Sequence, residues 1–501
     1  MTKSKTTWMV AALLLGLVLT AQARSAEAEP QTYIVLVGID KYADPQIKPR
    51  AFAEADAKAL YDLFTDKQYL GADAAHIRLL LGSEDKGRNA EKATHENILK
   101  ALKWLADKAE KQDTVILGLF LQGAPKGESS CYFATDSTYK DRAKNAVSGA
   151  EIEAQMERLK SQKFCALVDV NFKGFDSGKE TAPNLNLANL YKVYLGDAEK
   201  GTNVGRILFL ANSGTKPSLE TKDHGLFADV LLTALKGGAD KEGYEPDGLV
   251  TIDELTEYLE NTFPGKVREI AKTAEEKEQG YHVLGGRSSH FELTHNPEVS
   301  AKMKERLEKF EKLAKDKNLP ANVVEEGKQF LARMPKLEAQ RNLRKQYQAL
   351  VDGKVDVAGF NRERDKILES TKFNREDALA FAAKIIQATQ QVKEDYVKEL
   401  NQGEMVGWGI KGLYRRIDEP IPQDIKDRLD KIKKLNEKEL TELLADVRQK
   451  LGKREDLDEH KDIDYTLQRM LSNLDPYTTY IDPATLQRFQ QETDASFTGI
   501  G

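Results

Sequence analysis

Five short apolar runs in the first half of the chain constrain its fold more than any other feature. Val, Ile, Leu and Phe dominate them, and the segments between them have apolar residues at helical spacing. A strand that is one continuous apolar run is covered on both faces, as in a parallel sheet. The runs are Tyr33–Ile39, Ile77–Leu81, Val115–Leu121, Phe164–Val170 and Ile207–Ala211. This alternation predicts an α/β fold, a doubly wound and mainly parallel sheet with helices on both faces.

The second half of the chain predicts an all-α region. After Pro297 the density of charge rises, and apolar residues such as Leu307 and Phe310 recur at helical spacing. Further amphipathic segments lie around 323–334, 337–350, 376–399 and 424–451. A length of 501 residues agrees with several domains. We expect an α/β domain over 31–295, a helical linker or bundle over 296–390 and a second helical region over 391–501.

The N-terminus has the pattern of a secretory signal peptide. Lys3 and Lys5 precede the apolar stretch Trp8–Leu19, and Ala21 and Ala23 are small residues at the spacing that a signal peptidase recognises. We therefore expect residues 1–28 to be removed and the protein to be exported, to the periplasm or outside the cell. The alternative is an uncleaved anchor, because the stretch carries no charge. Beyond it, no apolar stretch approaches spanning length, so we expect no other membrane contact.

Composition limits the partners. The chain carries 75 Lys and Arg against 81 Asp and Glu, a net charge of -6, so it has no cationic excess to neutralise a phosphate backbone, and nucleic acid is not an expected partner. Its two cysteines cannot form a disulfide framework or a multi-cysteine zinc site. The sequence does not indicate the oligomeric state.

Six segments, in this order, resemble the caspase and metacaspase-like peptidases over roughly residues 31–265. They are VGIDKY (37–42), AEADAKAL (53–60), DTVILGLFLQGAP (113–125), FCALVDVNFKG (164–174), HGLFADVLLTALKGGAD (224–240) and DGLVTIDELTEYL (247–259). The third resembles the family's strand that ends in S-G-H-G, and the fourth resembles the strand that ends in D-A-C-H-S-G. The resemblance implies the caspase-like fold and a cysteine-peptidase ancestry.

Both positions of the catalytic dyad are substituted. Aligned on the strand ends, Gln122 stands at the histidine position and Asn171 at the cysteine position. A cysteine peptidase needs a thiolate that attacks the carbonyl carbon and an imidazole that moves the proton. A side-chain amide performs neither role at physiological pH. The sequence therefore predicts a pseudopeptidase.

The resemblance also implies what remains of the pocket. Gly123 is a candidate for a backbone N–H at the oxyanion position, and Asp169 and Asp40 are candidates for the substrate pocket, where a basic side chain would be the favoured guest. We expect a peptide or protein segment as the partner. An equally open interpretation is that the pocket is vestigial and the fold is only a scaffold.

Other residues could in principle replace the dyad, or hold a metal. Cys165 lies about 20 Å of strand before the site, and Cys131 is expected to be a buried thiol in a hairpin, with His224 as the remaining candidate base. Glu254 would be the last ligand of a calcium loop, but the first position is then Gly243, which has no carboxylate. We therefore expect Thr251 to cap a helix here, and we expect no metal and no cofactor.

The C-terminal forty residues resemble the region before the PDZ domain in carboxyl-terminal processing peptidases, the tail-specific serine proteases. The matching residues are LDPYTTY (474–480) and FTGIG (497–501), and DYVKELNQGEMVGWGIKGLYRRID (395–418) is similar to the helices that precede them. The sequence stops where the PDZ domain would start, so we expect a fragment of a longer gene product.

The sequence thus predicts an exported caspase-like pseudopeptidase with a peptide-binding or regulatory role, fused to the start of a tail-specific protease. The alternative is an active peptidase: a cysteine endopeptidase with relocated residues, or a serine protease in the full-length product.

Overall fold

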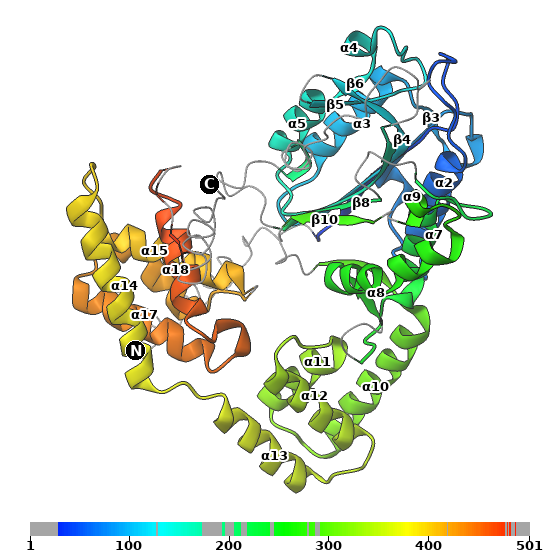
Figure 1. The fold of residues 1–501 in the computed structure, drawn as a ribbon. Coiled ribbons are helices and arrows are strands. Elements are labelled where there is room, and N and C mark those ends of the chain that lie inside the picture. Colours follow the sequence, from blue (N-terminus) through cyan, green and yellow to red (C-terminus); the bar gives the residue numbers. More distant parts are fainter. Residues whose placement is uncertain are drawn as a thin grey trace, which may run out of the picture.

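The first half of the chain folds around one large, mainly parallel sheet (Figure 1). The structure, a computed structural model, describes residues 29–126, 129–172, 193–195, 205–211, 218–240, 245–277, 280–285, 291–417, 419–475, 478, 480–481 and 486. The strand order is β10-β8-β7-β4-β1-β2-β3, in which only β10 runs antiparallel to its neighbour. The strands are β1 (Thr32–Gly38), β2 (Ile77–Leu81), β3 (Glu91–Lys92), β4 (Thr114–Lys126), β7 (Lys163–Asn171), β8 (Arg206–Leu210) and β10 (His282–Gly285). All five predicted strands are present.

Helices cover both faces of the sheet, which confirms the predicted doubly wound fold. Along β1, Ile34 and Leu36 pack into one cluster and Val35 and Val37 into another, because successive side chains of a strand point to opposite faces. Helices α2 (Ala53–Thr65), α7 (Leu226–Thr233) and α8 (Ile252–Ile270) contribute to the first cluster, and α3 (His95–Lys108) and α5 (Gly149–Arg158) to the second. Figure 1 shows α3 and α5 on one side of the sheet and α2 and α7 on the other.

Local signals start these helices where the sequence indicates. The hydroxyl of Thr94 accepts a hydrogen bond from the Asn97 N–H at the start of α3. Thr251 and Glu254 form a capping box at the start of α8, as the sequence predicted for Thr251. A cap of this kind contributes about 1 kcal/mol, since it satisfies backbone donors that the first helical turn leaves open.

The direction of winding reverses between β1 and β4, and this places the candidate site. From β1 the chain proceeds through α2 to β2 and β3, and then returns through α3 to β4 on the other side of β1. Ligands of such sheets bind outside the carboxyl ends of the strands at this reversal. Beyond that edge β4 continues into an antiparallel ribbon with β5 (Ser129–Tyr132) and β6 (Val147–Ser148).

A two-stranded sheet and short helices complete the first half. Strand β9 (Leu249–Thr251) pairs with β11 (Glu292–His295), so residues of the α/β unit extend to His295. The remaining short elements are the 3₁₀ turns η1 (Ala74–His76) and η2 (Lys86–Arg88), α4 (Arg142–Asn145), the π-helical turn η4 (Ala234–Gly238) that continues α7, and α9 (Ala274–Lys277).

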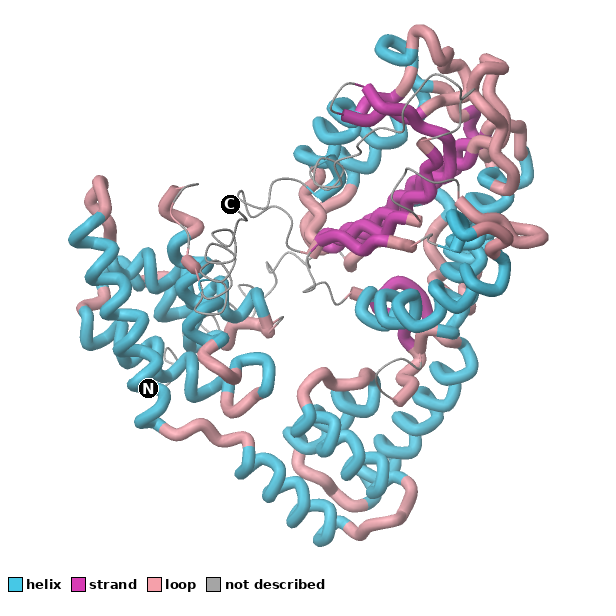
Figure 2. The backbone as a smooth tube through the Cα atoms, viewed as in Figure 1, coloured by secondary structure: helices cyan, strands magenta, loops and turns pink. Residues whose placement is uncertain are grey.

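The second half is helical, as predicted (Figure 2), and its described residues form two separate apolar cores. Phe310, Tyr347 and Phe360 lie in the first core, and Ile385, Ile410 and Met470 lie in the second. The first unit contains α10 (Pro297–Asp316), α11 (Ala321–Ala332), α12 (Glu338–Val351) and α13 (Val357–Ser370). The second contains α14 (Arg375–Asp395), α15 (Gln402–Arg416), α16 (Gln423–Leu429), η5 (Ile432–Lys434), α17 (Glu437–Leu451) and α18 (Lys461–Leu471).

One predicted helix is wrong in its extent. The segment expected as a single amphipathic stretch over 424–451 is two α-helices, α16 and α17. The side chain of Asn436 accepts a hydrogen bond from Glu439 N–H and starts α17 as a new helix.

Among the described residues, no helix is both long enough and apolar enough to cross a membrane. The expected signal peptide (1–28) and the segment FTGIG (497–501) lie outside the described residues.

Candidate functional site

The two positions that the resemblance predicts for the dyad, Gln122 and Asn171, lie side by side. Gln122 and Asn171 are direct partners in the parallel register of β4 and β7. Asn171 is the last residue of β7, and Gln122 lies where β4 leaves the parallel sheet and begins to pair with β5. Gln122 is buried, its N–H donates to the Tyr42 hydroxyl (2.7 Å), and its side-chain Nε2 donates to the Lys48 carbonyl oxygen (3.1 Å). The amide of Gln122 therefore joins the strand end to the loop that follows β1.

Both thiols are buried, although Cys131 pairs with Ala124, only two residues after Gln122. Cys165 lies within β7, six residues before Asn171, and is fully buried. Burial raises the pKa of its thiol well above the ordinary value, because the thiolate would lose its hydration. Cys131 is also fully buried, in β5, where it packs with Ile47 and Phe133. These environments are those of core cysteines, which are inert compared with catalytic thiolates.

The imidazole of His224 is held by a carboxylate. His224 Nδ1 lies 2.8 Å from Asp56 Oδ1, and the next residue, Gly225, donates its N–H to both carboxylate oxygens of Asp56 at 3.2 Å. Asp56 comes from α2 and is fully buried. Burial, and next to it the charge of Asp169, raises the pKa of Asp56 to about 8.

Asp169, the predicted pocket residue, forms a buried ion pair with an arginine of the same chain. Arg50 Nη2 lies 2.5 Å from Asp169 Oδ2, and both side chains are almost inaccessible. Ser218 donates its hydroxyl to the other carboxylate oxygen, at 2.5 Å. Burial opposes the charge of Arg50, but the carboxylate of Asp169 outweighs it, so the pKa of Arg50 is raised. The carboxylate of Asp169 is therefore buried and paired within the chain, and it is not exposed to a basic side chain of a partner.

The other two predicted pocket residues have structural contacts. Asp40 Oδ1 accepts a hydrogen bond from the Glu54 N–H at 3.0 Å, near the start of α2. Burial raises the pKa of Asp40. Gly123 is buried where β4 pairs with β5, opposite Tyr132. A Cβ at Gly123 would lie 2.7 Å from a ring carbon of Phe172 and 2.8 Å from Val170, so close packing explains the glycine.

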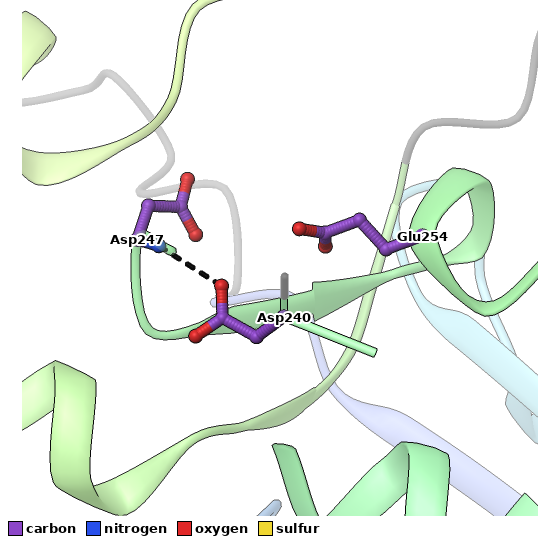
Figure 3. Close-up of side chains that lie close together, drawn as sticks. All are labelled: Asp240, Asp247 and Glu254. Carbon is purple, nitrogen blue, oxygen red and sulfur yellow. Dashed lines mark hydrogen bonds between the residues drawn. The ribbon is translucent and has the colours of Figure 1, made fainter. Parts of the chain in front are cut away.

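A second polar group lies at the junction with the helical half. The carboxylates of Asp240, Asp247 and Glu254 converge on a common space, with one oxygen of each within 4.8 Å of the others (Figure 3). Asp240 is fully buried and precedes the expected loop. Asp240 lies outside the calcium-loop pattern, whose first position, Gly243, is not among the described residues.

Backbone donors already bind most of these carboxylate oxygens. Asp240 accepts the N–H groups of Asp247 (2.9 Å) and Gly248 (3.0 Å). Asp247 accepts from Leu249 at 3.0 Å and from the Met334 N–H just after α11. Burial raises the pKa of Asp240 to about 6. Three such carboxylates could hold a divalent cation, which prefers oxygen ligands; the contacts that the structure shows fix the turn before β9 and attach α11 to it.

Three residues of these groups were not singled out by the sequence analysis. Arg50 stands in a loop without periodicity, Asp56 occurs within a helix pattern, and Asp240 follows a helix. Two signals could have found them: a buried helix position with a carboxylate, and a lone arginine just before the helix that follows the first strand. Neither signal indicates which residues these three side chains contact, because the contacting residues lie on distant segments of the chain.

Comparison with known proteins finds similarities in the first half of the chain. Residues 31–262 match the family model of the caspase domain. Among solved structures, a protein of Geobacter sulfurreducens is similar at 14% identity, over 51% of this chain and 94% of that chain, with a TM-score of 0.32. Caspase-1 from Spodoptera frugiperda is similar at 10% identity, over 51% of this chain and 86% of that chain, also with a TM-score of 0.32. No curated protein matches the sequence.

Proposed function

We propose that the caspase-like domain over residues 31–262 is a pseudopeptidase, a module that recognises a peptide or protein segment without cleaving it. We further propose that it is exported by the N-terminal signal peptide. In this proposal the C-terminal helices are the N-terminal region of a tail-specific protease, which the module serves by recognition or regulation.

The observation that carries the proposal is the register of β4 and β7. Gln122 and Asn171 are direct neighbours where the parallel pairing of β4 and β7 ends, and β4 is one of the two strands between which the winding reverses. Residues at two such positions can act together on one substrate bond. The side chains that occupy them are amides, which neither attack a carbonyl nor exchange a proton near neutral pH.

The expected loss of rate is large. General acid–base catalysis alone contributes about 10²–10⁴-fold, and without a thiolate the covalent route is lost as well. The buried thiols of Cys131 and Cys165 do not compensate, because neither is accessible to a substrate.

The described residues of the segment LDPYTTY (474–480) contact the helices that precede it, which agrees with the proposed relationship of the C-terminal region. Asp475 Oδ2 accepts the hydroxyl of Tyr396 (2.7 Å) and that of Thr478 (2.6 Å), so the segment is tied to the end of α14. The Tyr480 hydroxyl donates to Asp464 of α18 at 2.8 Å. These contacts give the described residues of the segment a structural role in one helical unit.

The test is a thiol-directed activity probe together with a peptide library, applied to the purified chain. We expect no labelling of the folded protein and no thiol-sensitive cleavage. Labelling of Cys131 or Cys165 in the folded state, together with cleavage that a thiol reagent abolishes, would contradict the proposal.

A pair of variants tests the geometry of the two positions. In Gln122→His with Asn171→Cys, an imidazole and a thiol stand on neighbouring strands in register, so we expect the probe to label the new thiol faster than in the matched control Asn171→Cys alone. The difference in labelling rate between the two variants measures activation of the thiol by the imidazole.

N-terminal sequencing of exported protein tests the signal peptide, with a mature start expected between residues 24 and 28.

A further inference from the structure

The loop after β1 places the buried side chain of Arg50 beside the ends of the parallel strands. Arg50 donates its backbone N–H to the carbonyl of Asp40 at 2.8 Å, and the neighbouring Lys48 carbonyl accepts the side chain of Gln122. The loop is thus attached to the ends of both β1 and β4. The Arg50 side chain is 6% exposed, although it comes from an irregular segment.

The guanidinium group finds its acceptors on the two strands that carry the substituted dyad. Nη1 donates to the carbonyl of Leu121 at 3.1 Å and to the carbonyl of Asp169, and Nη2 pairs with the Asp169 carboxylate. Leu121 directly precedes Gln122, and Asp169 stands two residues before Asn171. A planar group with several donors fits this set of carbonyl and carboxylate oxygens, whereas an ammonium on a flexible stem does not reach them all.

The segment 218–225 closes the far side of this group. Its Ser218 hydroxyl binds Asp169, and its Gly225 N–H binds Asp56. A Cβ at Gly225 would lie 2.9 Å from Asp56 Oδ2 and 3.4 Å from Asp169 Oδ2, so only a glycine allows the backbone to approach both carboxylates. The carboxylates, the two strand ends and this segment together surround the guanidinium.

We propose that these groups form a guanidinium-binding pocket and that Arg50 is its resident ligand, so that the pocket does not accept a charged side chain of a partner while Arg50 is in place. The inference rests on the proposed function, since it concerns the pocket of a module that does not cleave. It replaces the expectation that a basic side chain of a peptide is the guest. The ligand class is fixed by the chemistry of the lining: one guanidinium, held by a carboxylate and two strand-end carbonyls.

Removal of the resident ligand tests the proposal. Arg50→Ala leaves a space in the shape of ethylguanidinium, and this cation is titrated over a millimolar range against ethylammonium at equal ionic strength. At about ten times the dissociation constant, we expect ethylguanidinium to raise the Tm of Arg50→Ala by about 3–6 °C. We expect no rise with ethylammonium, with the wild-type protein, or with the double variant Arg50→Ala with Asp169→Asn. Equal effects of ethylguanidinium on the single and double variants would overturn the proposal.

A second measurement does not depend on the folding of Arg50→Ala. Peptides that carry one Arg are titrated into the wild-type chain and into Arg50→Lys, which keeps a charge but loses the planar donors. No saturable binding to the wild type supports the proposal, while wild-type binding that Asp169→Asn abolishes overturns it. The thiol-probe assay separates this proposal from the proposed function. A wild-type cysteine that the probe labels contradicts the pseudopeptidase. If the probe does not label the wild type and ethylguanidinium does not stabilise Arg50→Ala, only the role of Arg50 is contradicted.

Discussion

The substitution Glu254→Gln is expected to stabilise the protein at alkaline pH. Glu254 is half-buried beside Asp240 and Asp247, and burial raises its pKa to about 8 from an ordinary value of 4.5. Between these two values the folded chain holds a proton that the unfolded chain has released. The stability of the wild type therefore falls as the pH rises through this range, and the full penalty is present above about pH 8.

The magnitude follows from the size of the shift and the exposure of the side chain. Each pKa unit corresponds to ~1.4 kcal/mol, and solvent at a half-buried carboxylate screens part of this effect. We therefore expect Glu254→Gln to be more stable than the wild type by about 2 kcal/mol at alkaline pH. Near pH 4 we expect equal stability, because the wild-type carboxyl is then protonated in both states. The amide oxygen can still accept from Thr251, so the helix cap is kept.

The assay is urea denaturation followed by circular dichroism at acid, neutral and alkaline pH. The matched control is Glu260→Gln, an exposed position of the same helix, for which we expect no pH-dependent gain. If both variants show the same dependence on pH, or if Glu254→Gln is destabilised at alkaline pH, then burial does not raise the pKa of Glu254 as the structure indicates.

Three further outcomes follow from other parts of the structure. Asp169→Asn leaves the guanidinium of Arg50 buried without its counter-charge, and we expect a loss of about 3–5 kcal/mol in the free energy of unfolding, measured by chemical denaturation. Cys165 is expected to react with a thiol reagent only on unfolding, so its labelling rate in the native state should rise in step with denaturant concentration; rapid labelling without denaturant would contradict its burial. Gly412→Ala places a Cβ 2.3 Å from Arg469 Cβ, where α15 crosses α18, and we expect it to lower the Tm. In the control Gly407→Ala, on the same helix, the nearest atom to the new Cβ is 3.4 Å away, and we expect no loss of stability. Equal Tm values of the two variants would show that the helices do not approach so closely.

Local patterns in the sequence were enough to predict five strands of the α/β half and their alternation with helices. The run at 33–39 is β1 because apolar, β-branched residues without interruption fit only a strand that is covered on both faces. Thr94 and Thr251 start helices because their hydroxyl groups bind backbone donors a few residues away, a contact that depends only on neighbours in the chain. The strand-end motifs likewise identified Gln122 and Asn171 as the positions to compare.

The same patterns misjudged the extent of one element in the helical half. Around 424–451 the apolar spacing continues through a break, and periodicity alone did not show that α17 has a cap of its own at Asn436. Periodicity reports which face of a segment is buried, but it is a weak indicator of where a helix stops.

What the sequence by itself determined was five strands of the main sheet, their alternation with helices and two positions at which peptidase chemistry is predicted to be missing, since each depends on residues near one another in the chain. The tertiary structure alone decided that Arg50 meets Asp169 and that Asp240 meets Glu254. Those contacts depend on the path of loops between distant elements, and no periodic pattern encodes that path. The charge of a residue is written in the sequence, but the burial and the partners that set its energy arise only when the chain has folded.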